Sequence, residues 1–381
     1  MIVTVTLNPA LDLTYRVDAL VPHGTHRVAT VAERPGGKGI NVAAALRTLG
    51  EPVLATGLLG GATGGRVTEL LAGEGLPAAF VPIAGETRRT VVVADHDDAT
   101  GFWEPGPQVT AGEWAAFVAR FRDLLGSASV VALSGSLPPG VPVDGYADLI
   151  RLAAAAGVRT VLDTSGEALR YGLAAGPDLA KPNAAELCAL LEARAPALAS
   201  DSGPVSGRGP VSGPGPVSGP GPVSGPGPVS GPGPVSGPGP VSGPGPVLDS
   251  GPALDSGSDL GGPGRRAGGG PDGRELADAA VALALGARAV VVSRGPRGVL
   301  AVTADGAWRG VPPERIAGNP TGAGDACVAA LARGLRDQTP WPELLADAVA
   351  LSAAAVAAPS AGAVDRDTYR RLLTAVRVSA A

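Results

Sequence analysis

The stretch NPTGAGDACVAAL, residues 319–331, puts glycines at a turn that leads into a strong helix pattern. Glycines let such a turn aim its backbone N–H groups inward, and the positive end of the helix dipole reinforces them, so the junction can hold a phosphate. Asp325 stands at the first turn of the helix, where a carboxylate can accept a proton from a hydroxyl group that attacks phosphorus. Taken alone, the simpler interpretation is that Asp325 caps the helix and the glycines form a tight turn.

A second glycine-rich stretch also opens a helix. It reads PGGKGINVAAAL, residues 35–46, with Lys38 among the glycines and Asn41 on the first helical turn. One such loop is weak support for a ligand site, but two in one chain suggest two anionic or polyhydroxyl ligands. Neither loop reads GxxxxGK[ST] or GxGxxG, so neither is a Walker A loop or a dinucleotide-binding loop. The pair favours phosphoryl transfer to an alcohol.

Strand and helix patterns alternate along most of the chain, which predicts a doubly wound α/β fold with a mainly parallel sheet flanked by helices. The predicted strands are residues 1–7, 53–60, 129–135, 159–165, 178–183 and 288–295. Helices are predicted at residues 39–50, 65–75 and 146–157, each ending in glycine.

Two segments break this rhythm and look like antiparallel strands with polar turns, residues 12–37 and 87–107. We predict that they form a small β-sheet lid, which could close over a site at the carboxyl ends of the main strands. The predicted organisation is one domain over residues 1–381. It has an α/β core of residues 1–10, 36–84, 108–195 and 273–381, and a lid of residues 11–35 and 85–107.

The remaining segment, residues 196–272, is predicted to be a disordered insertion. From Gly203 to Ser256 it repeats the unit GPVSGP with some drift. A collagen helix is excluded because every other triplet has Ser where Gly must stand. This segment has too little apolar surface to offset the loss of conformational entropy that an ordered structure would cost. A docking tract for a proline-reading partner is the alternative, but no PxxP array with basic flanks is present.

Composition excludes several classes of function. The 381 residues carry a formal charge of -5 with scattered Lys and Arg, so a nucleic-acid partner is not expected. Cys188 and Cys327 lie far apart and outside any metal-binding motif, which fits a reducing, cytoplasmic setting. No apolar run is long enough to span a bilayer, so we expect no membrane partner.

Two stretches resemble the signature motifs of the ribokinase-like carbohydrate kinases of the phosphofructokinase B type: PGGKGINVA near the N-terminus and NPTGAGDA near the C-terminus. Between them come TLNPALD, GETR, SGSLPPG, DTSGEAL, KPNAAEL and VVVSRGPRGVL. This order resembles the branch that contains 1-phosphofructokinase, tagatose-6-phosphate kinase and the minor 6-phosphofructokinase. The resemblance covers nearly the whole chain except the insertion, and its fold agrees with the periodicity.

The resemblance implies an ATP-dependent kinase that converts fructose 1-phosphate to fructose 1,6-bisphosphate. It implies catalytic roles for Asp325 as base and for Gly322, Ala323 and Gly324 as anion hole. It implies substrate contacts by Asp12, Gly36, Gly37 and Asn41 with sugar hydroxyls, by Arg88, Lys38 and Arg27 with the phosphate already present, and by Ser136 in the same cleft. It places ATP at Lys181, Asn183, Glu186, Ser293, Gly295 and Gly298, with Mg²⁺ held mainly by phosphate oxygens and reached by Glu186 through water. A homodimer formed through the lid is also implied.

Several alternatives stay open. The minor 6-phosphofructokinases carry a basic residue where this chain has Thr25, and they lack the lysine where it has Lys38. These two differences argue against fructose 6-phosphate as the substrate. The motifs look as much like those of tagatose-6-phosphate kinases. Lys38 and Arg88 support a phosphorylated ketohexose without saying where its phosphate lies. A kinase of unphosphorylated sugars is a further rival, and a sugar-binding scaffold whose working part is the repeat is the non-enzymatic one.

Overall fold

The computed structural model describes residues 1–96, 98–192 and 271–381. The predicted insertion, residues 196–272, lies outside the described residues except at its last two positions, where α8 (Pro271–Ala284) begins. Within the described ranges, no helix combines the length and the apolar character needed to cross a membrane.

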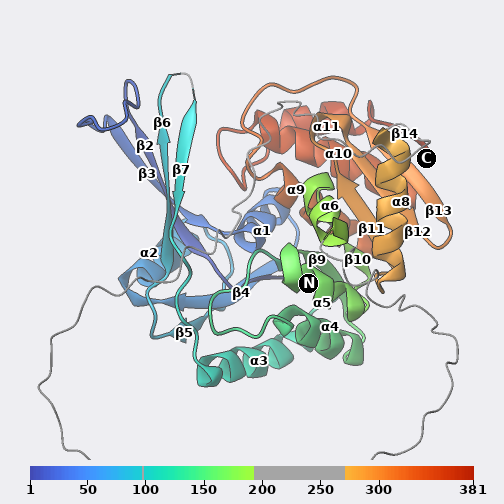
Figure 1. Cartoon of the computed structure of the whole chain (residues 1–381), viewed down its shortest axis with the longest axis horizontal. Helices are drawn as coiled ribbons and strands as arrows, with labels where there is room; N and C mark the ends of the chain where they lie inside the picture. The colour runs from blue at the N-terminus through green and yellow to red at the C-terminus, as the bar shows by residue number, and fades with distance from the viewer. Residues whose placement is uncertain (97, 193–270) are drawn as a thin grey trace, which may run out of the picture. The chain divides into compact units, whose positions relative to one another are not determined.

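A ten-stranded sheet forms the centre of the fold, in the order β14-β13-β12-β11-β10-β9-β8-β1-β4-β5 (Figure 1). At its middle, β1 (Ile2–Thr6) pairs in parallel with β4 (Val53–Gly60) on one side and β8 (Val130–Ser134) on the other. The other strands are β5 (Val81–Ile83), β9 (Arg159–Asp163), β10 (Leu179–Ala180), β11 (Ala289–Ser293), β12 (Val299–Thr303), β13 (Gly306–Val311) and β14 (Arg377–Ala380). Pairing is parallel from β5 to β11 and antiparallel from β11 to β14. The predicted doubly wound, mainly parallel sheet is confirmed, with an antiparallel edge that the sequence did not reveal.

Helices cover both faces of this sheet. One face packs against α1 (Lys38–Thr48), α2 (Gly61–Gly73), α9 (Ala323–Asp337) and α10 (Trp341–Ala357). The other packs against α3 (Ala111–Leu125), α4 (Gly145–Ala155), α5 (Gly166–Ala174), α6 (Ala184–Glu192) and α8. Along β1, Ile2 joins the first core and Val3 and Val5 join the second, as expected for a strand buried on both faces. The short helix α11 (Arg366–Leu373) packs on α10.

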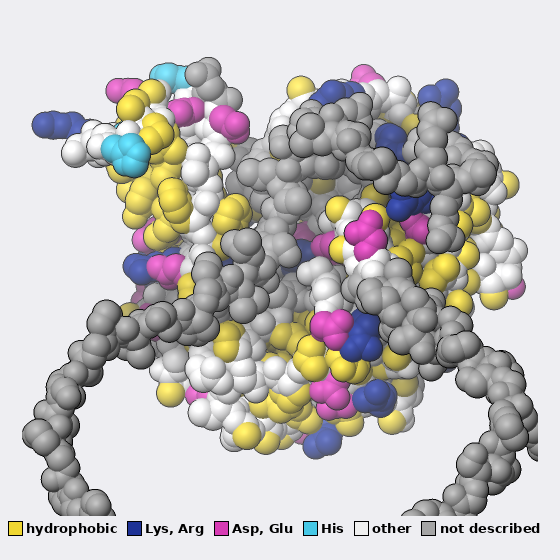
Figure 2. All heavy atoms as spheres, viewed as in Figure 1, with side chains coloured by type: hydrophobic (Ala, Val, Ile, Leu, Met, Phe, Trp, Pro, Cys, Tyr) yellow, Lys and Arg dark blue, Asp and Glu magenta, His cyan; other side chains and the backbone are white. Residues whose placement is uncertain are grey.

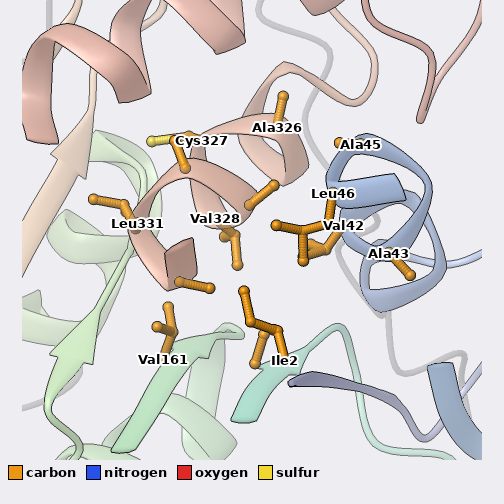
Figure 3. Packing of buried hydrophobic residues seen from close by; sticks show 14 of the residues in the cluster. Ile2, Val42, Ala43, Ala45, Leu46, Val161, Ala326, Cys327, Val328 and Leu331 are labelled. Atoms are coloured by element: carbon orange, nitrogen blue, oxygen red, sulfur yellow. The ribbon is translucent and has the colours of Figure 1, made fainter. Parts of the chain in front are cut away.

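The packing of α1 against α9 positions the site. Figure 3 shows Leu46 and Val42 of α1 beside Val328 of α9, above Ile2 of β1 and Val161 of β9. All five side chains are at most 1% exposed. Burying side chains of this size contributes about 1.5–3 kcal/mol each. This shared core holds the first turns of α1 and α9 next to each other.

The second sheet is the lid, in the order β3-β2-β6-β7. Its strands are β2 (Ala10–Arg16), β3 (Thr30–Gly36), β6 (Arg88–Ala94) and β7 (Ala99–Trp103). The pairs β2–β3 and β6–β7 are antiparallel, as expected for the two segments, whereas the pair β2–β6 that joins them is parallel, which the sequence analysis did not predict. The cause is the long connection through α1, β4, α2 and β5 between the two hairpins, because only a long crossover allows parallel pairing.

Candidate active site

Polar side chains gather at the carboxyl ends of the central strands. Asn8 and Ser136 follow β1 and β8, Asp163 ends β9, and Lys181 follows β10. The chain order reverses at β1, and ligands of open α/β sheets bind at the carboxyl ends of strands beside such a point. Asn8 Nδ2 donates a hydrogen bond to Ser136 Oγ (3.1 Å), which joins two of these strand ends.

The starts of α1 and α9 meet at the same edge. Asn41 Nδ2, on the first turn of α1, donates to Asp325 Oδ2, on the first turn of α9 (2.8 Å). Both helices begin after a glycine at positive φ, Gly37 (116°) and Gly322 (87°). A Cβ atom on Gly37 would also lie 2.7 Å from Thr6 Cγ2. Glycine is therefore required for this close approach of α1 to β1.

Burial makes Asp325 an unusually basic carboxylate. Asp325 is only 7% exposed. This burial raises the pKa of its carboxylate to about 7, with a smaller contribution from the negative charge of Asp163. The ammonium groups of Lys38 and Lys181 and the hydrogen bond from Asn41 act in the opposite direction. The carboxylate is thus poised to exchange a proton near neutral pH.

A buried ion cluster lies beside this carboxylate. Asp163 Oδ1 is 3.2 Å from Lys181 Nζ and 3.5 Å from Lys38 Nζ. Lys38 Nζ is also 3.8 Å from Glu186 Oε1. Burial alone would raise the pKa of Asp163, but the two ammonium groups hold it below its ordinary value. Asp163 in turn is the main cause of the raised pKa of Lys38, so these groups stay charged together.

The sequence analysis did not single out Asp163. A signal was present, because Asp163 is the last residue of an otherwise apolar strand, RTVLD, at the edge where ligands bind. Lys38 was expected to meet the phosphate of the substrate. Its ammonium group faces the carboxylates of Asp163 and Glu186, and its contact with a substrate phosphate stays a prediction.

The residues predicted to form the anion hole, Gly322, Ala323 and Gly324, lie at the start of α9. The N–H group of Ala323 donates to the carbonyl of Pro320 (3.1 Å), so it is already used in the turn. Gly324 and Asp325 are the second and third residues of α9, and N–H groups at these positions have no acceptor within a helix. A Cβ atom on Gly324 would lie 3.6 Å from Lys181 Nζ. The helix terminus and an ammonium group therefore adjoin one another, as anion binding requires.

The residues expected to hold the nucleotide lie on two neighbouring loops. Asn183 and Glu186 cap α6 reciprocally: the N–H of each donates to the side chain of the other, both at 2.8 Å. The N–H of Ser293, at the end of β11, donates to the carbonyl of Pro182 (3.1 Å). Gly295 and Gly298 belong to the following turn. Capping occupies Glu186 Oε2, while its Oε1 atom faces Lys38.

The lid places Asp12 and Gly36 in contact. A Cβ atom on Gly36 would lie 2.3 Å from Asp12 Cγ. Burial raises the pKa of Asp12 to about 6, although its hydrogen bond with Thr90 and the positive charges of Arg88 and Arg34 lower it. The lid thus presents a half-buried carboxylate beside a guanidinium.

Arg88 links the lid to the core, because its Nε donates to the backbone carbonyl of Asn8 (3.3 Å). Arg27 lies exposed in the connection between β2 and β3. Within residues 1–96, 98–192 and 271–381, no hydrogen bond or ion pair joins Arg27 to the other predicted site residues, so the structure does not assemble it with them.

The described carboxylates do not form a metal cage by themselves. Over residues 1–96, 98–192 and 271–381, no group of three or more His, Cys, Asp or Glu side chains could hold a metal ion. A cation bound here would need ligands from a phosphate or from water.

A sequence profile of the pfkB family of carbohydrate kinases matches residues 5–205 and 269–368. The chain belongs to this family. The resemblance inferred from the motifs is thereby confirmed, and the protein is a carbohydrate kinase.

Solved structures agree with the fold of this pfkB-family kinase. Phosphofructokinase-2 from Escherichia coli, in complex with potassium, is 27% identical with a TM-score of 0.73, over 98% of each chain. A possible 1-phosphofructokinase from Thermotoga maritima is 24% identical with a TM-score of 0.69, over 100% of this chain and 99% of that one. Ribokinase from Arabidopsis thaliana, complexed with ribose and ATP, is 18% identical with a TM-score of 0.63, over 98% of each.

Proposed function

We propose that this kinase transfers the γ-phosphoryl group of ATP to the 6-hydroxyl group of fructose 1-phosphate, giving fructose 1,6-bisphosphate. The observation that carries the proposal is the start of α9. There a carboxylate with a pKa near 7, held by Asn41, lies on the same helical turn as unpaired N–H groups and beside the ammonium group of Lys181. Base and anion hole in one place are what phosphoryl transfer to an alcohol needs.

The reaction follows from these groups. Asp325 accepts the hydroxyl proton as the sugar oxygen attacks the γ-phosphorus, and the bond from this phosphorus to the β,γ-bridging oxygen breaks so that ADP leaves. The N–H groups at the start of α9 and the ammonium group of Lys181 stabilise the negative charge on the transferring phosphoryl oxygens. Asp163 keeps Lys38 and Lys181 charged and holds their ammonium groups in place. Closure of the lid excludes water from this exchange.

ATP fits beside α6 and β11 because Lys181, Asn183 and Ser293 lie on adjoining loops at the strand ends. Mg²⁺ would arrive with ATP, where phosphate oxygens and water would be its main ligands and Glu186 would reach it through water. It would neutralise phosphate charge.

The lid supports a substrate that already carries a phosphate. Asp12 supplies a carboxylate for sugar hydroxyls, and Arg88, close enough to lower the pKa of Asp12, supplies a guanidinium suited to phosphate oxygens. The neighbouring Arg89 is a matched control, since it is exposed and pairs with Glu104 (2.6 Å). We expect Arg88→Ala to lower kcat/KM for the sugar phosphate about tenfold or more, and Arg89→Ala to change it little. Equal effects would argue against a phosphate clamp at Arg88.

The second candidate is a 6-phosphofructokinase. The similarity to Escherichia coli phosphofructokinase-2, which has also been solved in complex with fructose-6-phosphate, favours it. Tagatose-6-phosphate kinase is the third, because its substrate would use the same base and lid groups.

The deciding experiment compares kcat/KM for fructose 1-phosphate, fructose 6-phosphate, tagatose 6-phosphate, fructose and ribose with ATP and Mg²⁺. We expect a preference of about 100-fold, or about 2.7 kcal/mol, for fructose 1-phosphate. A higher value for fructose 6-phosphate or tagatose 6-phosphate would replace the proposed substrate and keep the role of Asp325.

Deletion of residues 203–256 addresses the scaffold alternative. The repeat lies outside the described residues. Because loop length costs only about 0.6 kcal/mol per doubling, we expect the shortened kinase to keep its activity and stability. Loss of turnover would make the repeat part of the mechanism.

We also propose a homodimer formed through the lid. Figure 2 shows hydrophobic side chains gathered along the projecting lid strands. The exposed large hydrophobic residues of this region are Val21, Val28, Val31, Phe102 and Trp103. An exposed apolar patch of this kind commonly marks a protein interface. Phe102→Asp should give a monomer in sedimentation equilibrium, whereas a monomeric wild-type chain would contradict the proposal.

A further inference from the structure

A cavity of about 430 Å³ lies against α1, and none of the residues proposed to bind ATP or sugar lines it. Four segments that are distant in sequence form its walls. They are Arg34 of β3; Ala44, Arg47 and Thr48 of α1; Glu74 and Leu76 after α2; and Gly362 and Ala363 before α11. The volume is typical of sites for small molecules. We call this cavity the α1 pocket.

Positive charge converges on the α1 pocket. Arg34 and Arg47 line it, and the guanidinium of Arg366 donates to the backbone carbonyl of Thr48 at its wall. None of these three guanidinium groups pairs with a carboxylate of a described residue. The only acidic side chain that lines the cavity, among the residues described, is Glu74.

Helix electrostatics account for only part of this arrangement. Arg47 lies in the last turn of α1 and Arg366 donates to the carbonyl of Thr48, the last residue of that helix, so both cations interact favourably with its C-terminus. Arg34 lies on a lid strand, and the helix terminus does not explain its position. Guanidinium groups that converge from separate elements onto one cavity are suited to oxygens of a phosphate, which they can bind in bidentate fashion.

We propose that the α1 pocket binds a small phosphorylated ligand that carries a hydroxyl group. The phosphate lies between Arg34 and Arg47, and the hydroxyl group donates to Glu74. This site is separate from the sugar-phosphate site proposed at Arg88, and the inference does not depend on the substrate of the kinase.

The α1 pocket also lies close to the catalytic groups. A Cβ atom on Gly362, one of its lining residues, would lie 3.2 Å from Asn41 Oδ1, and Asn41 holds Asp325. A Cβ atom on Gly322 would lie 3.1 Å from the backbone nitrogen of Gly362. A ligand in the α1 pocket would therefore be separated by a single residue, Gly362, from Asn41, which is the hydrogen-bond partner of Asp325. The same residue would separate the ligand from the first turn of α9.

The test is a calorimetric titration of the full chain with glycerol 3-phosphate, which combines a phosphate with hydroxyl groups. We expect Arg47→Gln to weaken binding about tenfold or more, because it removes charge-assisted hydrogen bonds. Glu74→Ala, which removes the acceptor of the hydroxyl group, should weaken the binding of glycerol 3-phosphate but not that of inorganic phosphate, a difference that a merely structural role for Glu74 would not produce. Arg88→Gln should leave binding unchanged.

Two outcomes would overturn the inference. One is the absence of binding to the wild-type chain up to about 10 mM probe. The other is binding that survives Arg47→Gln and is lost in Arg88→Gln, which would put the probe in the sugar-phosphate site and leave the proposed function standing. Arg47→Gln should melt within about 2 °C of the wild-type chain. If it does not, Arg34→Gln on the lid strand β3 provides the same test, again with weaker binding expected.

Discussion

Replacing Asp325 by Asn should abolish most turnover and at the same time stabilise the fold. The carboxylate is forced into a buried position beside Asp163, and its pKa is about 7 in the folded chain against an ordinary value of 3.8. Asn keeps the shape and a hydrogen-bond partner for Asn41 but cannot be ionised. Loss of the base should lower kcat by about 10²–10⁴-fold.

The sign of the stability effect follows from proton binding. Because the folded pKa is raised, the folded chain binds more protons than the unfolded chain between pH 3.8 and about 7. The wild-type chain therefore loses stability as pH rises through this window. Each pKa unit corresponds to about 1.4 kcal/mol, so the ionised carboxylate costs on the order of 2–4 kcal/mol above pH 7. Asp325→Asn escapes this loss, and its advantage should grow with pH.

Urea unfolding of both proteins between about pH 5 and 8 measures this difference. Asp365→Asn is a matched control, because the pKa of Asp365, which caps α11, is lowered by the N–H of Thr368. Its carboxylate contributes stability that disappears as pH falls, so that variant should gain no advantage as pH rises. A stability difference for Asp325→Asn that is independent of pH, or near-normal turnover in the folded variant, would refute the reasoning.

Three further predictions concern the same site. The kcat/KM of the wild-type kinase should fall as pH drops below about 7, because protonated Asp325 cannot accept a proton; a flat profile down to about pH 5.5 would exclude it as the base. Asp163→Asn should lower the free energy of unfolding, measured with urea, by about 3–5 kcal/mol, because it leaves the buried ammonium group of Lys181 without its partner. A change under about 1 kcal/mol would mean that water or Glu carboxylates replace the Asp163 carboxylate. Gly36→Ala should lower kcat/KM for the sugar about tenfold or more, because its Cβ atom would lie 2.3 Å from Asp12 Cγ. The control Gly65→Ala should not lower it, because no heavy atom lies within 4 Å of its added Cβ atom. Equal steady-state kinetics for the two variants would contradict a role for the contact between Gly36 and Asp12.

The elements of the fold were predictable where their signals are local. The alternation of side chains predicts strand β1. Backbone angles that neighbouring residues set explain the glycines within residues 35–39 and 322–324 and the helices that end in glycine. The antiparallel strands β12 to β14 and the parallel pairing of β2 with β6 were not predicted. Strand direction depends on the path of the connection through space, which a strand's own residues do not encode.

The candidate site divides in the same way. Asp325, Asn41 and the glycines before each helix could be proposed from the sequence, because a glycine turn, a helix start and a polar first turn are adjacent along the chain. Asp163 could not be assigned a role, since its partners Lys38 and Lys181 come from other segments. Lys38 was expected to meet a phosphate, and its ion pairs with Asp163 and Glu186 could not be predicted, because a long side chain on a helix start can reach several neighbours.

The amino-acid sequence by itself determined the alternating α/β pattern and the two glycine-rich helix starts, and it indicated Asp325 as the candidate base. Only the tertiary structure decided how basic Asp325 is, which carboxylates Lys38 faces, and that four distant segments enclose the α1 pocket. The physical reason is that a residue type carries its charge and its backbone preferences with it. Burial and the distance to other charges arise only when the chain is folded.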